Sequence, residues 1–376
     1  MKIAILGTRG IPNNYGGFEQ FAEYLGEGLV RKGHQVTVYN PSFHPYTDEV
    51  YKGINIITKY SPENRIGSLA NFYYDWICSL DASKRDFDIV YHAGYQSAAP
   101  GIKYFSSKSD SLWLTNMDGI EWKRDKWSKA IKWLTKIMEK IAIKNSDYLI
   151  SDNVGIQKYY KDFYKTDSFF LAYGANVPKE VFSSVLGSYN LIDNNFSIVI
   201  ARLEPENSIE IILEGYTQSK NNKELLVIGN NDTKYGNYLK NKFSKFSYVK
   251  FVGGIYNKKH LDALRKYSEF YFHGHTVGGT NPSLLEAMAV GANIIAHNNI
   301  FNKSVLQGNA QFFIKQNDLT FIINESENKD FSNYRNSVRE IIKDKYSWDK
   351  IILQHIELFE NVIIKKNHEN NNYYSR

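Results

Sequence analysis

The chain has 376 residues, of which 43% are hydrophobic and 15% aromatic, so it can fill two cores of ordinary size and extensive disorder is not expected. Its one cysteine, Cys78, excludes an intrachain disulfide framework and suits a reducing compartment. The N-terminal apolar run is too short for a secretory signal, and no apolar run reaches the length of a membrane span. The net charge of +6 is mild, so the positions of the charges matter more than their sum.

The N-terminal half alternates apolar strands with helices. A strand over 2–6 leads into a glycine-containing loop, 7–17, and then into a helix with Phe18, Phe21 and Leu25 on one face. Further strands are expected over 35–39, 54–58, 88–92, 111–117 and 148–151. This alternation predicts a parallel, doubly wound sheet, in which ligands bind beyond the carboxyl ends of the strands. The loops of interest are therefore 7–17, 92–97, 116–122 and 152–155.

A second series of the same kind begins near Asn195. Its strands are expected over 196–201, 224–228, 249–252, 269–272, 293–296 and 311–314. The stretch 173–195 has Gly, Pro, Ser and Asn without apolar periodicity, which is typical of a linker between domains. The sequence therefore predicts an α/β protein with two Rossmann-like domains facing a cleft. A last apolar-periodic helix is expected from Trp348 to about Ile364, before a polar tail.

The stretch 273–298, HGHTVGGTNPSLLEAMAVGANIIAHN, combines the features of an anion site. A short strand precedes a glycine loop, and a helix is expected to begin after Asn281 as N-cap, with Pro282 in its first position, and to end at Gly291. Backbone N–H groups and the helix dipole at such a start favour a phosphate or another anion. An ordinary βαβ turn remains the alternative, because a glycine loop before a helix is a weak motif.

Five stretches stand in the same order as in one enzyme family: GTRGIPNNYGGFEQ, NMDGIEWKR, SDNVGIQ, ARLEPENS and HTVGGTNPSLLEAM. Over nearly its whole length the chain resembles GT-B glycosyltransferases of the large retaining family usually numbered four. Within that family it looks closest to a subgroup that includes bacterial polysaccharide rhamnosyltransferases. The resemblance implies an acceptor and membrane-facing domain over 1–180 and a nucleotide-sugar domain over 181–350. It also implies a terminal segment, 351–376, whose helix returns to the N-terminal domain.

The chain departs from the common family pattern at three positions. Arg202 is present, but Asn207 stands where the family has a lysine, and Gly278 stands where it has the first of two glutamates. Asp118 lies near the position of a family histidine. The substituted loops keep glycines and polar side chains, which favours a subgroup with different ligand contacts over an inactive protein.

The resemblance implies a nucleotide-diphosphate sugar as donor substrate and no cofactor. The diphosphate is the leaving group, and Arg202 is the best cation to stabilise it, while Glu286 would accept hydrogen bonds from ribose hydroxyls. Asp118 is the candidate for the acceptor hydroxyl or the sugar ring. The predicted catalytic residues are Asp118 and Arg202, and the predicted substrate-binding residues are Gly16, Gly17, Glu19, Arg202, Asn207, His275, Gly279, Thr280, Asn281, Ser283, Leu284 and Glu286.

Structural alternatives remain for these residues. Arg202 could be a surface residue, Gly16 and Gly17 a tight turn, and Asp118 the start of an Asx-turn. No Asp-x-Asp pair stands at a convincing strand end, so no essential metal is expected.

The segment Trp122–Lys144 is basic and aromatic. Eight Lys or Arg residues stand there against Asp125 and Glu139. One helical face is expected to be buried and the opposite face to carry lysines. The expected buried stripe is Trp127, Ala130, Ile131, Leu134, Ile137, Met138 and Ile141, and the lysines are Lys129, Lys132, Lys136 and Lys140. Tryptophan beside excess positive charge favours contact with an anionic membrane over a merely solvated face, and no binding motif supports nucleic acid.

Together these observations predict a cytoplasmic retaining glycosyltransferase, peripheral on the inner face of a bacterial membrane. It would move a sugar, L-rhamnose from dTDP-rhamnose being one candidate, onto a lipid-diphosphate-linked saccharide in surface polysaccharide assembly. Two alternatives are a nucleotide-sugar 2-epimerase-like isomerase and a non-catalytic protein that binds nucleotide sugars.

Overall fold

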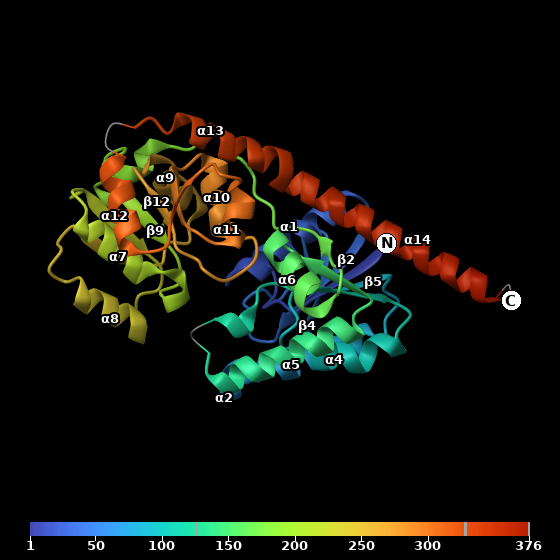
Figure 1. Cartoon of the computed structure of the whole chain (residues 1–376). Coiled ribbons are helices and arrows are strands. Elements are labelled where there is room, and N and C mark those ends of the chain that lie inside the picture. Colours follow the sequence, from blue (N-terminus) through green and yellow to red (C-terminus); the bar gives the residue numbers. More distant parts are fainter. Residues whose placement is uncertain (125–126, 327–328, 375–376) are drawn as a thin grey trace. The chain divides into compact units, whose positions relative to one another are not determined.

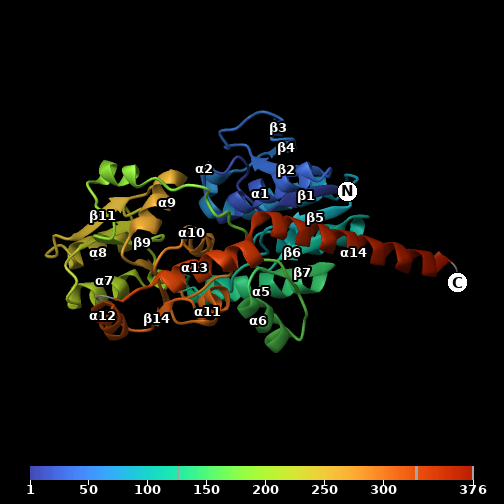
Figure 2. The ribbon, with the colours of Figure 1, turned by 90° about the horizontal axis from the view of Figure 1, so that it is seen from above.

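The protein is described by a computed structural model over residues 1–124, 127–326 and 329–374, with side chains to residue 369. The chain divides into two compact units (Figures 1 and 2). Unit 1 contains Met1–Trp122, Lys129–Tyr173 and Trp348–Arg376, and unit 2 contains Lys123–Ser128 and Gly174–Ser347. The divisions thus fall at 173/174 and 347/348, where the sequence placed them at 180/181 and 350/351.

Unit 1 is built on an eight-stranded sheet with the order β3-β4-β2-β1-β5-β6-β7-β8. All its pairs are parallel except β3 with β4, and β1, β2, β5 and β6 are buried along nearly their whole length, as expected for strands covered on both faces. The strands are β1 (Lys2–Leu6), β2 (Gln35–Pro41), β3 (Val50–Tyr51), β4 (Ile54–Lys59), β5 (Ile89–His92), β6 (Leu112–Asn116), β7 (Tyr148–Ser151) and β8 (Phe169–Phe170).

The helices of unit 1 include one that follows unit 2 in the chain. They are α1 (Gly17–Arg31), α2 (Glu63–Ile66), α3 (Ala70–Ala82), α4 (Ala99–Phe105), α5 (Lys129–Asn145), α6 (Val154–Tyr164) and α14 (Trp348–Tyr374), with short 3-10 turns at Gly67–Leu69, Ser106–Lys108 and Glu121–Lys123. α14 packs along α1 (Figure 2): Trp348 stacks on Tyr24 with ring centroids 5.0 Å apart, and a Cβ on Gly28 would collide with Ile352. The terminal helix therefore does return to the N-terminal domain.

Unit 2 holds a six-stranded, wholly parallel sheet with the order β11-β10-β9-β12-β13-β14. Its strands are β9 (Phe196–Ile200), β10 (Glu224–Ile228), β11 (Val249–Gly253), β12 (Tyr271–His273), β13 (Ile294–His297) and β14 (Gln311–Phe313). Its helices are α7 (Ile209–Gln218), α8 (Lys234–Lys242), α9 (Lys258–Tyr267), α10 (Pro282–Val290), α11 (Ile300–Leu306), α12 (Gln316–Glu325) and α13 (Ser332–Ile341), with 3-10 turns at Ser183–Tyr189 and Pro205–Asn207 and a π turn at Ile342–Tyr346. The predicted two-domain α/β fold is confirmed.

The buried face predicted for α5 is wrong at three of its seven positions. α5 buries Thr135, Met138, Glu139 and Ala142, while Ile131, Leu134 and Ala130 of the expected stripe are exposed. A carboxylate takes the inner position because Glu139 accepts hydrogen bonds from three tyrosines of α6: Tyr159, Tyr160 and Tyr164. Apolar residues of α5 therefore remain at the surface. Among the residues described, no helix combines the length and apolarity needed to span a bilayer.

Candidate functional site

The centre of the sheet in unit 2 brings two loops together. β9 pairs with β10 on one side and with β12 on the other, so the order of the strands reverses there. The loops after β9 and β12 meet at this point: Thr276 donates to the Glu206 carbonyl through its backbone N–H (3.0 Å) and its hydroxyl (2.8 Å). A Cβ on Gly274 would strike the Asn207 carbonyl, so this close approach requires glycine. This is the position at which parallel α/β sheets bind ligands.

Arg202 stands at the carboxyl end of β9 with an exposed side chain. No described residue forms an ion pair with its guanidinium. Asn207 is buried, and its side-chain amide donates to the Arg202 carbonyl over 2.7 Å. Asn207 therefore shapes the turn that presents Arg202, rather than pointing its own amide at a ligand.

His275 lies beside this cation as a neutral imidazole. Its ring stacks on that of His273 with centroids 4.4 Å apart, and the amides of Asn299 and Asn302 donate to its carbonyl over 2.9 and 3.0 Å. Burial, together with the positive charges of Arg202 and Arg124, lowers the pKa of His275 to about 3. The site thus concentrates positive potential without charging the imidazole, which favours an anionic ligand.

The start of α10 has the predicted caps. The Asn281 side chain accepts from the Ser283 N–H over 2.9 Å, Pro282 is the first helical residue, and Gly291 ends the helix in the left-handed conformation. These bonds also use donors that the sequence assigned to a ligand, because the Leu284 N–H donates to the Asn281 carbonyl. The Leu284 side chain is buried in the core.

The glycine loop before α10 is open at Gly278, where the resembled family has a glutamate. Gly278 has φ +141°, and a Cβ there would meet nothing within 4 Å. Gly279 is half-buried, whereas Thr280 is buried and has polar or ring contacts within the protein. Backbone groups of Gly278 and Gly279 are therefore better placed for a ligand than the Thr280 side chain.

Glu286 and Ser283 share a buried partner that sequence reasoning missed. Arg265 of α9 forms an ion pair with Glu286 (2.7 Å) and donates to the Ser283 hydroxyl (3.1 Å), which also lies 2.9 Å from the Tyr271 hydroxyl. The side chain of Arg265 is only 2% exposed. Arg265 thus fixes the positions of both predicted ligand-binding side chains. A charged residue among the apolar positions Leu261, Ala263 and Leu264 was the available signal.

Glu206 is a second residue that the sequence reasoning did not single out. Its carboxylate is buried, and the guanidinium of Arg124 lies 3.8 Å from it. Since a buried charge without a partner is costly, the pairing anchors the Arg124 segment in unit 2.

The loop after β1 holds the predicted glycines and Glu19. Gly16 is the N-cap of α1 without a side-chain bond, and Gly17 is the first helical residue. Glu19 is 2% exposed and accepts from the Arg9 N–H over 2.7 Å. Burial raises the pKa of its carboxyl group, against the lowering effect of that hydrogen bond. Glu19 therefore organises the loop from within.

Asp118 is half-buried just past β6. Burial raises the pKa of Tyr173, and among the nearby charges that add to the shift are Asp118, Asp152 and Glu19. Unit 1 thus gathers Asp118 and Glu19 around one tyrosine. Asp118 and Glu19, two predicted site residues that are far apart in the sequence, therefore both lie close enough to Tyr173 to affect its pKa.

Comparisons with known proteins match each half of the chain. Residues 1–176 match a family described as a domain of unknown function, DUF1972, and residues 189–345 match the family of group 1 glycosyl transferases. An uncharacterized glycosyltransferase of Methanocaldococcus jannaschii is 21% identical, with 96% of this chain and 99% of that relative covered.

Solved structures with the same fold span nearly the whole chain. Sucrose-phosphate synthase from Thermosynechococcus elongatus superposes with a TM-score of 0.81 at 16% identity, covering 97% of this chain and 99% of its own. HepE of Anabaena, in complex with UDP and glucose, superposes with a TM-score of 0.74 at 15% identity, covering 96% and 100%.

Proposed function

We propose that this chain, a glycosyltransferase with the GT-B fold, is a retaining enzyme that moves a sugar from a nucleotide-diphosphate donor to a lipid-linked saccharide. The observation that carries the donor class lies in unit 2. The exposed Arg202, the neutral His275 and the start of α10 lie at the reversal of strand order. HepE, which shares the fold, was solved with UDP and with UDP-glucose.

In the proposed reaction, the bond between the anomeric carbon and the diphosphate oxygen breaks while the acceptor oxygen attacks from the same face. The acceptor proton passes to the departing diphosphate oxygen, so a protein nucleophile is not required. Arg202 stabilises the charge that develops on the diphosphate, together with the α10 dipole and backbone N–H groups of Gly278 and Gly279. Glu286, fixed by Arg265, accepts from the ribose hydroxyls.

We assign the acceptor side to unit 1. Asp118 is the proposed partner of the acceptor hydroxyl or the sugar ring. The backbone of Gly16 and Gly17 can also contact the substrate closely, because glycine has no side chain to keep it away. Glu19 holds this loop through the Arg9 N–H.

The proposed donor sugar is L-rhamnose from dTDP-rhamnose, because the chain resembles polysaccharide rhamnosyltransferases in the five stretches named above. The proposed acceptor is a saccharide on a lipid diphosphate, at the inner face of a bacterial membrane. The lysines and exposed tryptophan of α5 support this location, since both favour an anionic interface.

A panel of nucleotide sugars tests the donor assignment. The midpoint of thermal unfolding should shift upward with the true donor, because a ligand at free concentration c that binds the folded state stabilises it by RT ln(1 + c/Kd). Transfer to a lipid-linked saccharide should then release the nucleoside diphosphate and retain the anomeric configuration. Conversion of the donor without any acceptor would instead support an epimerase, and binding without turnover a non-catalytic protein. Transfer that a chelator abolishes and magnesium restores would contradict the metal-independent mechanism.

A further inference from the structure

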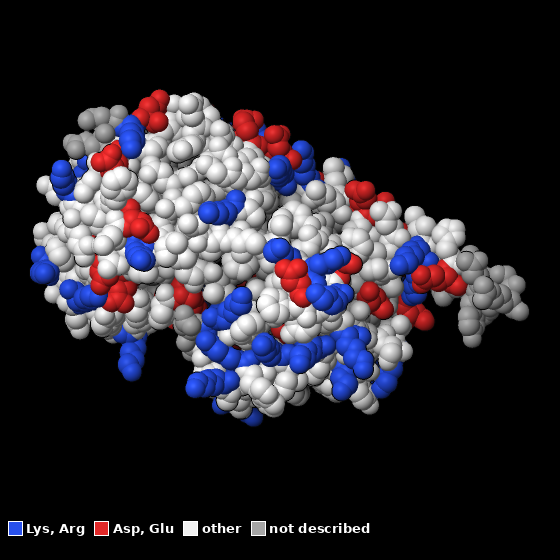
Figure 3. All heavy atoms as spheres, viewed as in Figure 1, with Lys and Arg blue, Asp and Glu red and all other residues white. Residues whose placement is uncertain are grey.

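The outer face of α5 carries positive charge that the helix itself does not balance. α5 contains five lysines, Lys129, Lys132, Lys136, Lys140 and Lys144, and one carboxylate, Glu139. Glu139 is fully buried and accepts from the hydroxyls of Tyr164 (2.8 Å), Tyr160 (3.0 Å) and Tyr159 (3.2 Å). Figure 3 shows the resulting band of Lys and Arg side chains over this part of unit 1.

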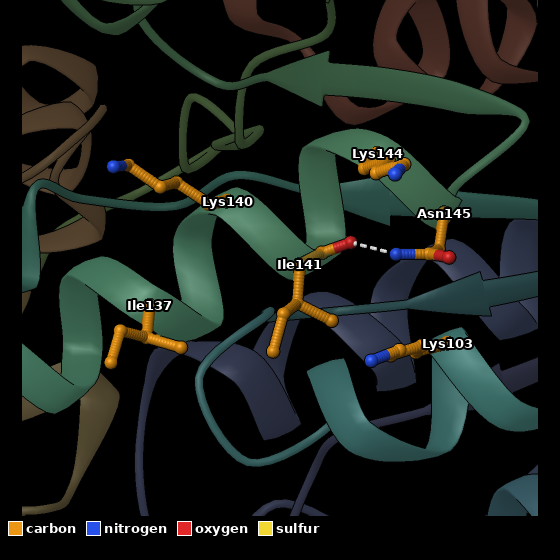
Figure 4. Close-up of a pocket in the computed structure, with 6 residues that line it drawn as sticks. All are labelled: Lys103, Ile137, Lys140, Ile141, Lys144 and Asn145. Atoms are coloured by element: carbon orange, nitrogen blue, oxygen red, sulfur yellow. Dashed lines mark hydrogen bonds between the residues drawn. The ribbon is translucent and has the colours of Figure 1, made fainter.

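A cavity of about 270 Å³ opens between α4 and α5 within this basic face. It is lined by Lys103, Ile137, Lys140, Ile141, Lys144 and Asn145 (Figure 4). Ile137 and Ile141 project from α5 on the side that faces α4, and Lys103 extends from α4 toward Ile141. The Asn145 side-chain amide is already used, because it donates to the Ile141 carbonyl over 2.6 Å. The cavity therefore offers aliphatic carbon from Ile137 and Ile141, with Lys103 extending toward it and the other lysines at its rim.

The three lysines lack counter-charges in the part of the chain that the structure describes. No ion pair there involves Lys103, Lys140 or Lys144, although lysines elsewhere in unit 1 are paired, as Lys59 is with Asp81. All three are exposed. A cavity below roughly 300 Å³ is smaller than typical pockets for drug-sized ligands, so it suits a headgroup rather than a whole amphiphile.

Exposed apolar side chains continue along the same helix. Trp133 is 68% exposed, Ile131 40% and Leu134 38%. Tryptophan and aliphatic side chains beside lysines are the composition of helices that lie in a membrane interface, with the apolar residues in the acyl region and the lysines at the phosphates. A soluble anion would leave this apolar surface in water, and nucleic acid would need a stacking platform near the charges.

We propose that the α4–α5 cavity binds the phosphate headgroup of an anionic phospholipid. Lys103, Lys140 and Lys144 surround the phosphate, and Ile137 and Ile141 contact its glycerol and first acyl carbons. The inference rests on the membrane location in the proposed function and adds a defined site to it. Docking of unit 1 then depends on headgroup chemistry as well as on surface charge.

The test compares two triple variants with the same change in charge. One is Lys103→Gln, Lys140→Gln and Lys144→Gln in the cavity, and the other is Lys129→Gln, Lys132→Gln and Lys136→Gln along α5. Both proteins, checked for folding by circular dichroism and thermal unfolding, are sedimented with phosphatidylcholine vesicles that contain phosphatidylglycerol. In a parallel series, oleate replaces phosphatidylglycerol, so that the same negative surface charge is carried by carboxylates and the only phosphates are those of zwitterionic phosphatidylcholine.

Each lysine near an anionic surface contributes about fivefold, so the lost charge alone should cost either variant up to roughly 100-fold in partitioning to phosphatidylglycerol vesicles. The cavity variant should lose more than this, because it also loses its direct contacts with the phosphate. The α5 variant should lose less, and the difference between the two should disappear on oleate vesicles. If the two variants lose equally on phosphatidylglycerol vesicles as well as on oleate vesicles, diffuse electrostatics accounts for the binding and the headgroup site is overturned. Unchanged sedimentation of the cavity variant would overturn it as well.

Two further measurements separate this inference from its rivals. The first is binding of a single-stranded oligonucleotide. If it binds the unaltered protein more tightly than vesicles do, and if this binding depends on the cavity lysines, the ligand of the cavity is nucleic acid and not a phospholipid. Sugar transfer by the unaltered protein to a lipid-linked saccharide dispersed in neutral detergent tests the proposed enzyme without any vesicle. Its absence would contradict the proposed function while leaving the vesicle result intact.

Discussion

The helices α10 and α5 each carry a glutamate with its carboxylate held by partners inside the protein, half-buried in Glu286 and fully buried in Glu139, and the two are stabilised in different ways. Glu286 of α10 is paired with the buried guanidinium of Arg265, and Glu139 of α5 accepts from three tyrosine hydroxyls. In α10, charge neutralises charge beside the proposed donor site. In α5, neutral donors satisfy the carboxylate, so the lysines keep their charge for the outer face. The same residue type thus leaves one helix electrically balanced and the other cationic.

The largest expected effect follows from breaking the pair at α10. Arg265→Met removes the buried cation that pairs with Glu286, which should lower the free energy of unfolding by about 3–5 kcal/mol. Urea denaturation measures the loss. The double variant Arg265→Met with Glu286→Leu should recover much of it, because an apolar pair avoids the uncompensated charge. If the double variant is as unstable as the single one, the ion pair is not the cause.

Arg202→Ala tests the proposed stabilisation of the departing diphosphate at the donor site beside α10. The side chain is exposed and forms no ion pair among the described residues, so the midpoint of thermal unfolding should change little. Sugar transfer should fall by roughly 10²–10³-fold in kcat, because a fixed donor to the leaving group is lost. Arg202→Lys should restore only part of this, since an ammonium group lacks the planar fork. Unchanged kinetics in Arg202→Ala would remove this residue from the site.

Glu139→Gln should have a smaller effect on stability than Arg265→Met. One amide oxygen cannot replace both carboxylate oxygens for three hydroxyl donors, so the expected cost is about 1–3 kcal/mol in chemical denaturation. Tyr164→Phe, which removes one donor and leaves the carboxylate, is the matched control. A loss as large as that of Arg265→Met would show that Glu139 acts through its charge.

His92 provides a third case, a buried ionisable group with no hydrogen bond to either ring nitrogen among the described residues. Burial lowers its pKa from 6.5 to about 3, so the folded state favours the neutral ring. Its contribution to stability is complete above pH 6.5 and decreases as the pH falls toward 3, by up to roughly 1.4 kcal/mol per pH unit. His92→Phe should match the unaltered protein at neutral pH and become the more stable of the two in acid. Parallel pH profiles of unfolding would contradict this.

The sequence predicted α10 well because its boundaries depend on local chemistry. Asn281, Pro282 and Gly291 specify the start and end of the helix wherever it packs. The buried face of α5 depends instead on the tyrosines of α6, which no period within α5 can reveal. The predicted order of strands and helices was enough to locate the candidate site. It could not show which hydrogen-bond donors at the site remain available to a ligand. Asn207, Ser283 and Leu284 use theirs inside the protein, and only the packing of α9 against α10 brings Arg265 to Glu286.

The return of α14 to unit 1 has a consequence for synthesis. The ribosome makes the strands of unit 1 first and the helix that covers α1 last, after all of unit 2 between Gly174 and Ser347. Until then Trp348 and Ile352 are not yet packed against the face of α1 that contains Tyr24 and Gly28. The first unit to begin is therefore the last to be completed, and a chain cut short after unit 2 would expose an apolar groove to chaperones and proteases.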